Sequence, residues 1–250
     1  MFRFRCWGER VMLIAALAVA PACAGEFGVT PLRVDLDNAS RNGVITVNND
    51  GDKPLRVNMK LMKWTQSENG DDKYADSDVL LFFPRAMTID AMDKRVVRIG
   101  LKVPIAGTQQ TEQAYRLFIE EAPPDETDPK KNQVQFRFRF AIPVFVAPSE
   151  RNVDIKLESL TVDKSKLSAV VVNNGTETVR FDNLRISADP DWEQSSGGQY
   201  HMPATRRRYD LDIPATECRG GRKLKLVLKS EKATLEREIT LTPENCAQAK

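Results

Sequence analysis

The chain has 250 residues with 37 basic and 35 acidic side chains, so its formal charge at neutral pH is +2. Three of the basic and one of the acidic residues lie in the first 24 positions, which leaves 34 of each in the rest of the chain. A balanced charge excludes a large sequence-independent attraction to nucleic acid, because such binding depends on clustered side chains that neutralise phosphates.

Residues 1–24 have the layout of a secretory signal peptide. Three arginines precede an apolar stretch at 11–20, and the small residues of the phrase PACAG suit cleavage before Gly25. The stretch is too short to span a bilayer, and no later apolar run reaches 18 residues, so we expect an exported chain without stable membrane insertion. A lipid anchor on Cys23 is the alternative, although the leucine that usually stands three residues upstream is missing.

The cysteines that follow the signal predict a disulfide and no metal site. Cys218 and Cys246 form a single pair in an oxidising compartment, and we expect them to be bridged. Two isolated cysteines and one histidine, His201, offer neither the number nor the spacing of zinc ligands. His201 lies in the glycine-rich phrase GGQYHMP, and the chain has no phosphate-binding glycine loop. We therefore expect no enzyme activity and no cofactor.

The rest of the chain predicts short β-strands separated by turn-forming phrases. In the first half, runs rich in β-branched and aromatic residues lie at 43–50, 55–64, 78–83, 94–103 and 113–121. In the second half, similar runs lie at 151–160, 166–174, 177–187, 222–230 and 233–241. The basic phrase TRRR at 205–208 is typical of a solvated loop. The pattern predicts an all-β protein of two sandwiches. We place the domains at 25–147 and 148–250, because Pro148 cannot continue a strand ladder.

The phrase QVQFRFRFAI at 133–142 alternates apolar and polar residues without a break. A strand turns successive side chains to opposite faces, so the apolar residues form one row with a spacing of about 6.6 Å. The row consists of Val134, Phe136, Phe138, Phe140 and Ile142. Such a row needs a cover, which is either the protein's own core or a partner.

The phrases TPLRVDLD, ITVNNDGDKPLRV, FPRAMTID, KRVVRIGL, EQAYRLFIEEAP and IPVFVAP, in that order, resemble the periplasmic pilus-assembly chaperones of bacteria. The resemblance covers nearly all of residues 27–148, whereas the second domain matches only in length, strand pattern and late cysteine pair. It implies two immunoglobulin-like sandwiches in a boomerang arrangement, with pilus subunits and an outer-membrane usher as partners. It also implies that the row at 133–142 fills the open groove of a subunit as a donated strand. Self-association of the empty chaperone is left open.

The resemblance further implies a basic anchor for the C-terminal carboxylate of the subunit. The family uses an arginine on the first strand, matched here by Arg33, and a lysine where this chain has Pro143. Arg116 is a candidate replacement, because its strand should run antiparallel to the donor strand and start near Pro143. Arg98 is a second candidate. The departure suggests a branch of the family away from its best-known type.

A secreted two-domain adhesin or structural subunit is the alternative function. Such a protein would keep residues 133–142 inside its own sheet. The order of phrases that leads to PVFVAP favours the chaperone. Co-purification with a smaller, otherwise unstable partner would distinguish the two.

Overall fold

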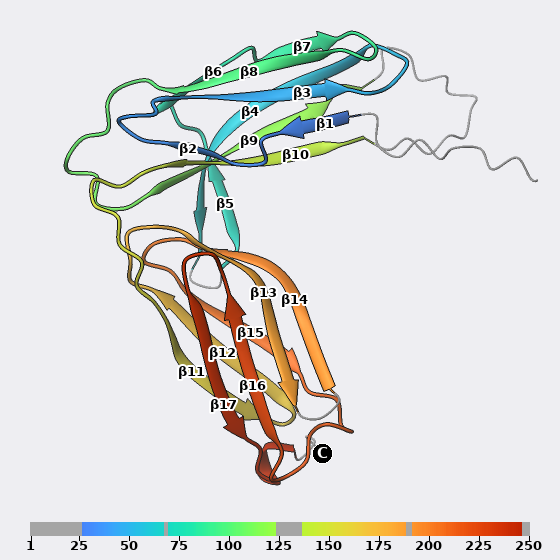
Figure 1. Cartoon of the computed structure of the whole chain (residues 1–250), viewed down its shortest axis with the longest axis vertical. Coiled ribbons are helices and arrows are strands. Elements are labelled where there is room, and N and C mark those ends of the chain that lie inside the picture. The colour runs from blue at the N-terminus through green and yellow to red at the C-terminus, as the bar shows by residue number, and fades with distance from the viewer. Residues whose placement is uncertain (1–26, 68–69, 124–136, 189–191, 247–250) are drawn as a thin grey trace, which may run out of the picture.

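The computed structural model describes residues 27–67, 70–123, 137–188 and 192–246, which form strands and one short 3-10 helix (Figure 1). Across these ranges, no helix combines the length and the apolar character that a membrane crossing requires. The strands build four sheets in two stacked pairs, so the prediction of an all-β protein is confirmed.

Two sheets form the first sandwich. The smaller sheet has the order β1 (Phe27–Thr30), β3 (Asn42–Asn49), β8 (Lys94–Leu101) and β6 (Leu80–Phe83). The larger sheet has the order β2 (Val34–Leu36), β10 (Arg139–Val146), β9 (Gln113–Glu121), β4 (Leu55–Gln66) and β5 (Asp72–Ala75), and β7 (Ala86–Ile89) pairs with β4. Alternation of side chains places one face of each strand in the shared core. In β8, for example, Val97 and Ile99 are buried whereas Arg98 is exposed.

The second sandwich has a core of its own, which is formed by residues between Ile155 and Leu241. Its smaller sheet has the order β11 (Ile155–Asp163), β12 (Lys166–Asn173) and β15 (Arg206–Asp212). Its larger sheet has the order β14 (Trp192–His201), β13 (Val179–Ala188), β16 (Lys223–Lys229) and β17 (Thr234–Thr240). The helix η1 (Glu244–Cys246) follows the last strand.

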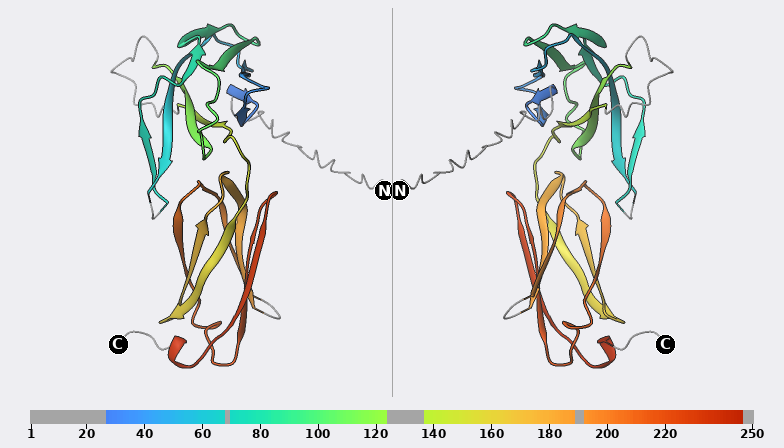
Figure 2. Two further views of the ribbon diagram at one scale, coloured as in Figure 1. Left: turned by 90° about the vertical axis from the view of Figure 1, so that its left-hand side faces the viewer. Right: turned by 90° about the vertical axis from the view of Figure 1, so that its right-hand side faces the viewer.

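The two sandwiches meet end to end at an angle, and the β4–β5 hairpin of the first reaches toward the second (Figure 1). The side views in Figure 2 show the same arrangement. The boomerang of two immunoglobulin-like sandwiches predicted from the resemblance is confirmed. β10 ends at Val146 and β11 begins at Ile155, so residues 147–154 connect the two sandwiches.

Two strands of the second sandwich were missed. β14 is an edge strand whose polar residues give little hydrophobic alternation, and β15 contains the basic phrase assigned to a loop. The three arginines of the phrase are paired with β12, so the loop assignment was wrong. Pairing with a buried neighbour decides the conformation here, because strand propensity depends strongly on context.

Candidate functional site

β10 has one edge that is fully paired and one edge that is partly open. β9 pairs with the whole strand, whereas β2 pairs with Val144–Val146 only and runs parallel to β10. Within the described part of the chain, no strand pairs with the second edge of residues 139–143. An edge of this kind presents unpaired N–H and C=O groups that a further strand can bind.

Backbone groups of successive β10 residues point to opposite edges. The N–H of Ala147 donates to the β2 side at 2.9 Å, and the carbonyl of Phe138 accepts from the β9 side at 3.1 Å. The odd-numbered residues therefore direct their groups to the open edge. This edge offers the N–H and C=O groups of Arg139 and Ala141 and the carbonyl of Pro143, which has no N–H. The proline costs no ladder bond to β9, because its nitrogen faces the open side.

The residues of the apolar row in the predicted donor strand differ in how far they are buried. Phe138 is 46% exposed, and Phe140 is half-buried with its ring edge-on to Phe27 at 4.9 Å between centroids. Ile142 is 2% exposed and belongs to the first core, so it departs from the expectation of an open apolar surface. The reason is that the inner face of this sheet packs on the opposite sheet at that level. Two further members of the row, Val134 and Phe136, lie outside the described residues.

Arg33 lies directly before β2, at the point where the open edge of β10 ends. Its Nη2 is 2.7 Å from Oδ1 of Asp35, and its guanidinium lies 4.5 Å from the centre of the Phe145 ring. Burial alone would lower the pKa of Arg33, but the hydrogen bond and the charge of Asp35 outweigh burial and raise it. The first residue of β2, Val34, stands opposite Val144, so the Arg33 backbone is beside the last open position of β10.

Arg116 is the Cα partner of Pro143 across β9 and β10, as the antiparallel arrangement predicted. Its guanidinium lies 3.9 Å from the centre of the Trp64 ring, and its Nη2 is 3.5 Å from Oδ2 of Asp72. Arg98 is exposed on β8 in the other sheet of the sandwich. The structure therefore does not bring Arg98 to Pro143.

An aromatic cluster at the junction of the sandwiches holds both Arg33 and Arg116. Trp64 and Phe145 come from the first sandwich, and Tyr200 from the second packs on them at ring distances of 5.1 and 5.9 Å. We did not predict this cluster from the sequence. Phe145 gives the one available signal, since an aromatic residue stands there on the outward face of the alternating phrase PVFV.

Polar contacts also tie the two sandwiches together. The Glu112 carboxylate accepts a hydrogen bond from the Thr178 N–H at 3.0 Å, and the Glu112 N–H donates to the Thr176 carbonyl at 2.8 Å. Burial raises the pKa of Glu112, although the bonds with Thr178 oppose the shift. Arg151 lies 3.8 Å from Asp37 of the first sandwich. These specific bonds support the angle between the sandwiches.

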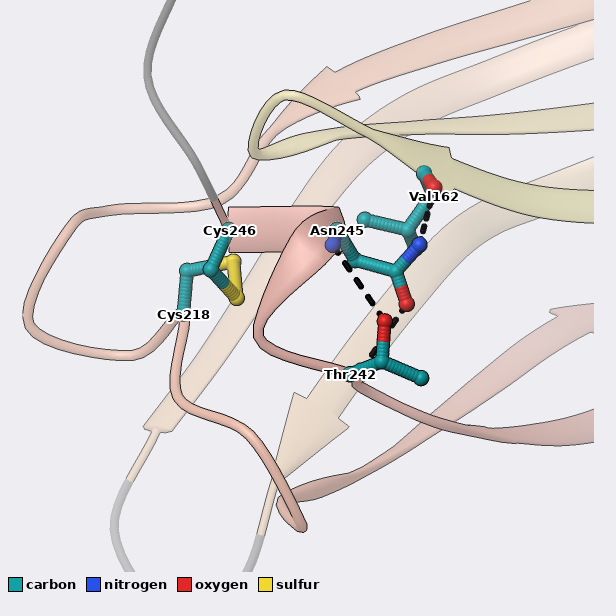
Figure 3. The surroundings of a disulfide bond; sticks show 5 residues. All are labelled: Val162, Cys218, Thr242, Asn245 and Cys246. Atoms are coloured by element: carbon teal, nitrogen blue, oxygen red, sulfur yellow. Dashed lines mark hydrogen bonds between the residues drawn. A yellow bond between two sulfur atoms is a disulfide. The ribbon is translucent and has the colours of Figure 1, made fainter.

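The predicted disulfide between Cys218 and Cys246 is present (Figure 3). It links the connection between β15 and β16 to η1, at the end of the second sandwich that lies away from the first (Figure 1). Asn245 beside it donates to the Val162 carbonyl at 2.7 Å and accepts from the Thr242 N–H at 2.9 Å (Figure 3). The bridge therefore fastens η1 to the second sandwich and lies away from Arg33 and Arg116.

The fold and the site together define a two-sandwich protein with an open strand edge that ends beside Arg33. The family model described as "Pili and flagellar-assembly chaperone, PapD N-terminal domain" matches residues 26–152, which is just over half of the chain. The chain therefore belongs to this family of pilus-assembly chaperones. No curated protein sequence matches the chain.

Solved structures of chaperones share the fold. One is the CsuC chaperone of Acinetobacter baumannii in its pre-assembly complex with the tip adhesion subunit CsuE, with 18% identity, a TM-score of 0.61, and coverage of 87% of this chain and 100% of that chain. The YadV chaperone gives 16% identity, a TM-score of 0.59, and coverage of 87% and 100%. The CupB2 chaperone of Pseudomonas aeruginosa gives 16% identity, a TM-score of 0.54, and coverage of 85% and 99%.

Proposed function

We propose that this protein is a periplasmic chaperone that binds, folds and caps pilus subunits by donor-strand complementation and delivers them to an outer-membrane usher. The observation that carries the proposal is the open edge of β10 at residues 139–143, which continues from the exposed Phe138. Family membership and the fold shared with chaperones support it. The role is non-catalytic, with residues 25–147 as the donor domain and 148–250 as the second domain.

The pairing of β2 sets where a bound subunit strand ends. A strand added to residues 139–143 meets β2 at Val144 and cannot continue along β10. When the added strand runs parallel to β10, its C-terminus arrives beside Arg33. The backbone of Pro143 offers no donor at this level, so a charge-assisted bond from Arg33 to the terminal carboxylate takes the place of the next ladder bond. Arg116, the cross-strand partner of Pro143, adds a second positive charge behind this position.

The apolar row supplies the affinity of the donated strand. Phe138 and Phe140 occupy successive pockets in the open core of the subunit, and Val134 and Phe136 extend the same row. Full burial of a large apolar side chain stabilises by about 1.5 to 3 kcal/mol, although ordering costs on association offset much of this gain. Main-chain hydrogen bonds between the donated strand and the subunit also contribute to the affinity, as they do in other strand-addition complexes. The complex needs no nucleotide, because the donated strand completes the subunit core directly.

Co-expression with the cognate subunit tests the proposal. The chaperone, expressed with its own leader and purified from the periplasm, should carry a smaller subunit in equal amounts. The same subunit expressed alone should aggregate or be degraded, because its unpaired edge and open core are exposed. A chaperone that leaves the subunit unprotected and purifies without it would refute the proposal. Assembly of the chain into fibres of its own would instead favour the adhesin or structural subunit.

A further inference from the structure

β6 is the last strand of the smaller sheet in the first sandwich, and one of its edges has no partner strand. β8 pairs with Leu80–Phe83 along one edge, and no strand within the described residues pairs with the other. β6 lies in the sheet opposite to β10, on the side of the first sandwich that faces away from the second (Figure 1). The molecule therefore has another open strand edge besides that of β10.

The backbone groups of β6 alternate between its two edges. The Val79 carbonyl accepts from the Lys102 N–H at 3.1 Å, so the odd-numbered residues of this stretch direct their backbone groups toward β8. The N–H and C=O groups of Leu80 and Phe82 therefore point to the open edge, together with the carbonyl of Pro84, which has no N–H. Unpaired groups of this kind can bind a further strand.

The solvent-facing side of β6 is apolar. Val79, Leu81 and Phe83 are 37%, 57% and 75% exposed, and alternation places all three on the outer face of the sheet. Gly100, the neighbour of Leu81 on β8, has no side chain that could cover it. The edge strand β17 of the second sandwich instead carries two exposed glutamates, which is a common protection against pairing. The unprotected apolar edge of β6 favours the addition of another strand.

The charges beside β6 have opposite signs at its two ends. Asp76 and Asp78 precede the strand. Arg85 follows it, and Arg98 stands opposite Phe83 on β8. A second copy of β6 that runs antiparallel brings its basic end to the acidic end of the first, whereas a parallel copy would set like charges together. The strand is therefore complementary to an antiparallel copy of itself.

We propose that β6 is the contact strand of a two-fold dimer, in which two copies of the chain pair antiparallel through their open edges. The register that sets Leu81 against Leu81 of the second copy also sets Val79 against Phe83, so each exposed apolar residue meets another. Leu80 of one copy then faces Phe82 of the other, and the two exchange both N–H···O bonds. The apolar residues occupy the non-hydrogen-bonded positions, where opposite side chains lie closest.

The two-fold arrangement closes on itself and leaves β10 free. Each copy uses its β6 edge once, so association stops at the dimer. β10 belongs to the other sheet, so both copies keep the open edge at 139–143 and Arg33. A contact between two strands of four residues is smaller than a standard interface, so the dimer should be transient and dependent on concentration.

Sedimentation equilibrium of the protein purified from the periplasm, between about 1 µM and 1 mM, tests the proposal. The wild type should fit a monomer–dimer equilibrium without larger species. Leu81→Glu and Leu81→Lys should each weaken the dimer about tenfold or more, because they remove apolar contact and place like charges opposite each other at the two-fold axis. An equal mixture of the two variants should recover dimerisation, since opposite charges then pair. Leu81 is exposed, so both variants should keep the thermal unfolding of the wild type.

Two controls separate this interface from other modes of self-association. Val44→Glu changes an exposed apolar residue on β3, which lies inside the same sheet and away from its open edge. Phe138→Glu changes the proposed donor strand. Both variants should dimerise like the wild type.

A wild type that stays monomeric up to about 1 mM would overturn the proposal. Loss of the dimer in Val44→Glu would replace it with packing between sheet faces, and loss in Phe138→Glu would replace it with pairing through β10. A mixture of the two Leu81 variants that stays monomeric would refute the two-fold register and the dimer with it. If the wild type is monomeric and Leu81→Glu prevents fibre assembly in cells, the strand binds a different protein and the dimer is refuted. Sedimentation of the free protein does not depend on subunit capture, so failure of the proposed function would leave these results unchanged.

Discussion

A charge at Phe138 should damage subunit capture more than it damages the chaperone. Phe138 stands at the start of the open part of β10 and is 46% exposed in the free protein. Phe138→Glu removes apolar surface from the position that would enter a subunit pocket and places a carboxylate there. In the free chaperone the same carboxylate still reaches water.

The exposed fraction of Phe138 determines how much binding free energy and how much unfolding free energy the substitution should remove. Full burial of a phenylalanine is worth about 1.5 to 3 kcal/mol, so roughly half of that, about 1 kcal/mol, remains for a partner to gain. Desolvating an unpaired carboxylate adds several kcal/mol to the loss. The complex should therefore weaken by about 3 kcal/mol or more, which is at least a hundredfold in the dissociation constant. The free energy of unfolding of the chaperone should fall by only about 1 kcal/mol.

The measurements are thermal unfolding of the purified variant and the yield of its complex with the co-expressed subunit. Arg139→Gln is the control, because Arg139 faces the other way and forms an exposed ion pair with Glu120 at 2.6 Å. Such a pair contributes little, so capture by the control should change only slightly. If Phe138→Glu unfolds the chaperone, or if Arg139→Gln harms capture more, the row belongs to an internal core and the donor-strand argument fails.

Three further predictions concern the anchor, the disulfide and a buried histidine. Arg33→Gln should reduce capture by about 1.5 to 3 kcal/mol while leaving thermal unfolding nearly unchanged, and wild-type capture would place the anchor elsewhere. Replacing Cys218 and Cys246 together by serine should lower the free energy of unfolding by about 3 to 4 kcal/mol, since the bridge spans a separation of 28 residues, yet capture should persist. Burial, aided by the charge of Arg207, lowers the pKa of His201 from 6.5 to about 3. The unfolded chain therefore binds a proton below pH 6.5 that the native protein refuses, and stability is lost as the pH falls. Between pH 6.5 and 5 the wild type should lose about 1.6 kcal/mol that His201→Gln retains, and parallel unfolding curves for the two proteins would contradict this.

The strands that were predicted correctly have a strong alternation of apolar and polar residues. The strands that were missed lack this alternation, and they form because neighbouring strands pair with them. β8 and β9 alternate clearly and lie close to their predicted positions, whereas β14 and β15 carry polar and basic residues and depend on pairing with β13 and β12. The antiparallel approach of Arg116 to Pro143 followed from strand order alone and is confirmed.

Only some residues of the candidate site could be predicted, because only some of them lie in a recognisable sequence pattern. Arg33 and the apolar row lie in phrases that resemble the family. The contact of Tyr200 with the aromatic cluster comes from the second sandwich and depends on the angle between the domains, which no pattern in the chain encodes. The burial of Ile142 also depends on tertiary packing, since alternation alone does not tell which residues of a row lie in the core.

The structure also explains how the protein keeps an open strand edge available while restricting what can bind to it. Exposed edges invite indiscriminate pairing, and proteins limit this with short edges, charges and prolines. All three devices occur on β10: β2 covers the strand from Val144 onward, Arg139 brings charge to the start, and Pro143 removes a donor at the end. A strand that only pairs through its backbone gains few ladder bonds over residues 139–143. In the proposed function, stable addition would therefore require side chains that bury Phe138 and Phe140 together with a carboxylate that reaches Arg33, and this combination would favour a subunit with an open groove and a free C-terminus over an arbitrary unfolded chain.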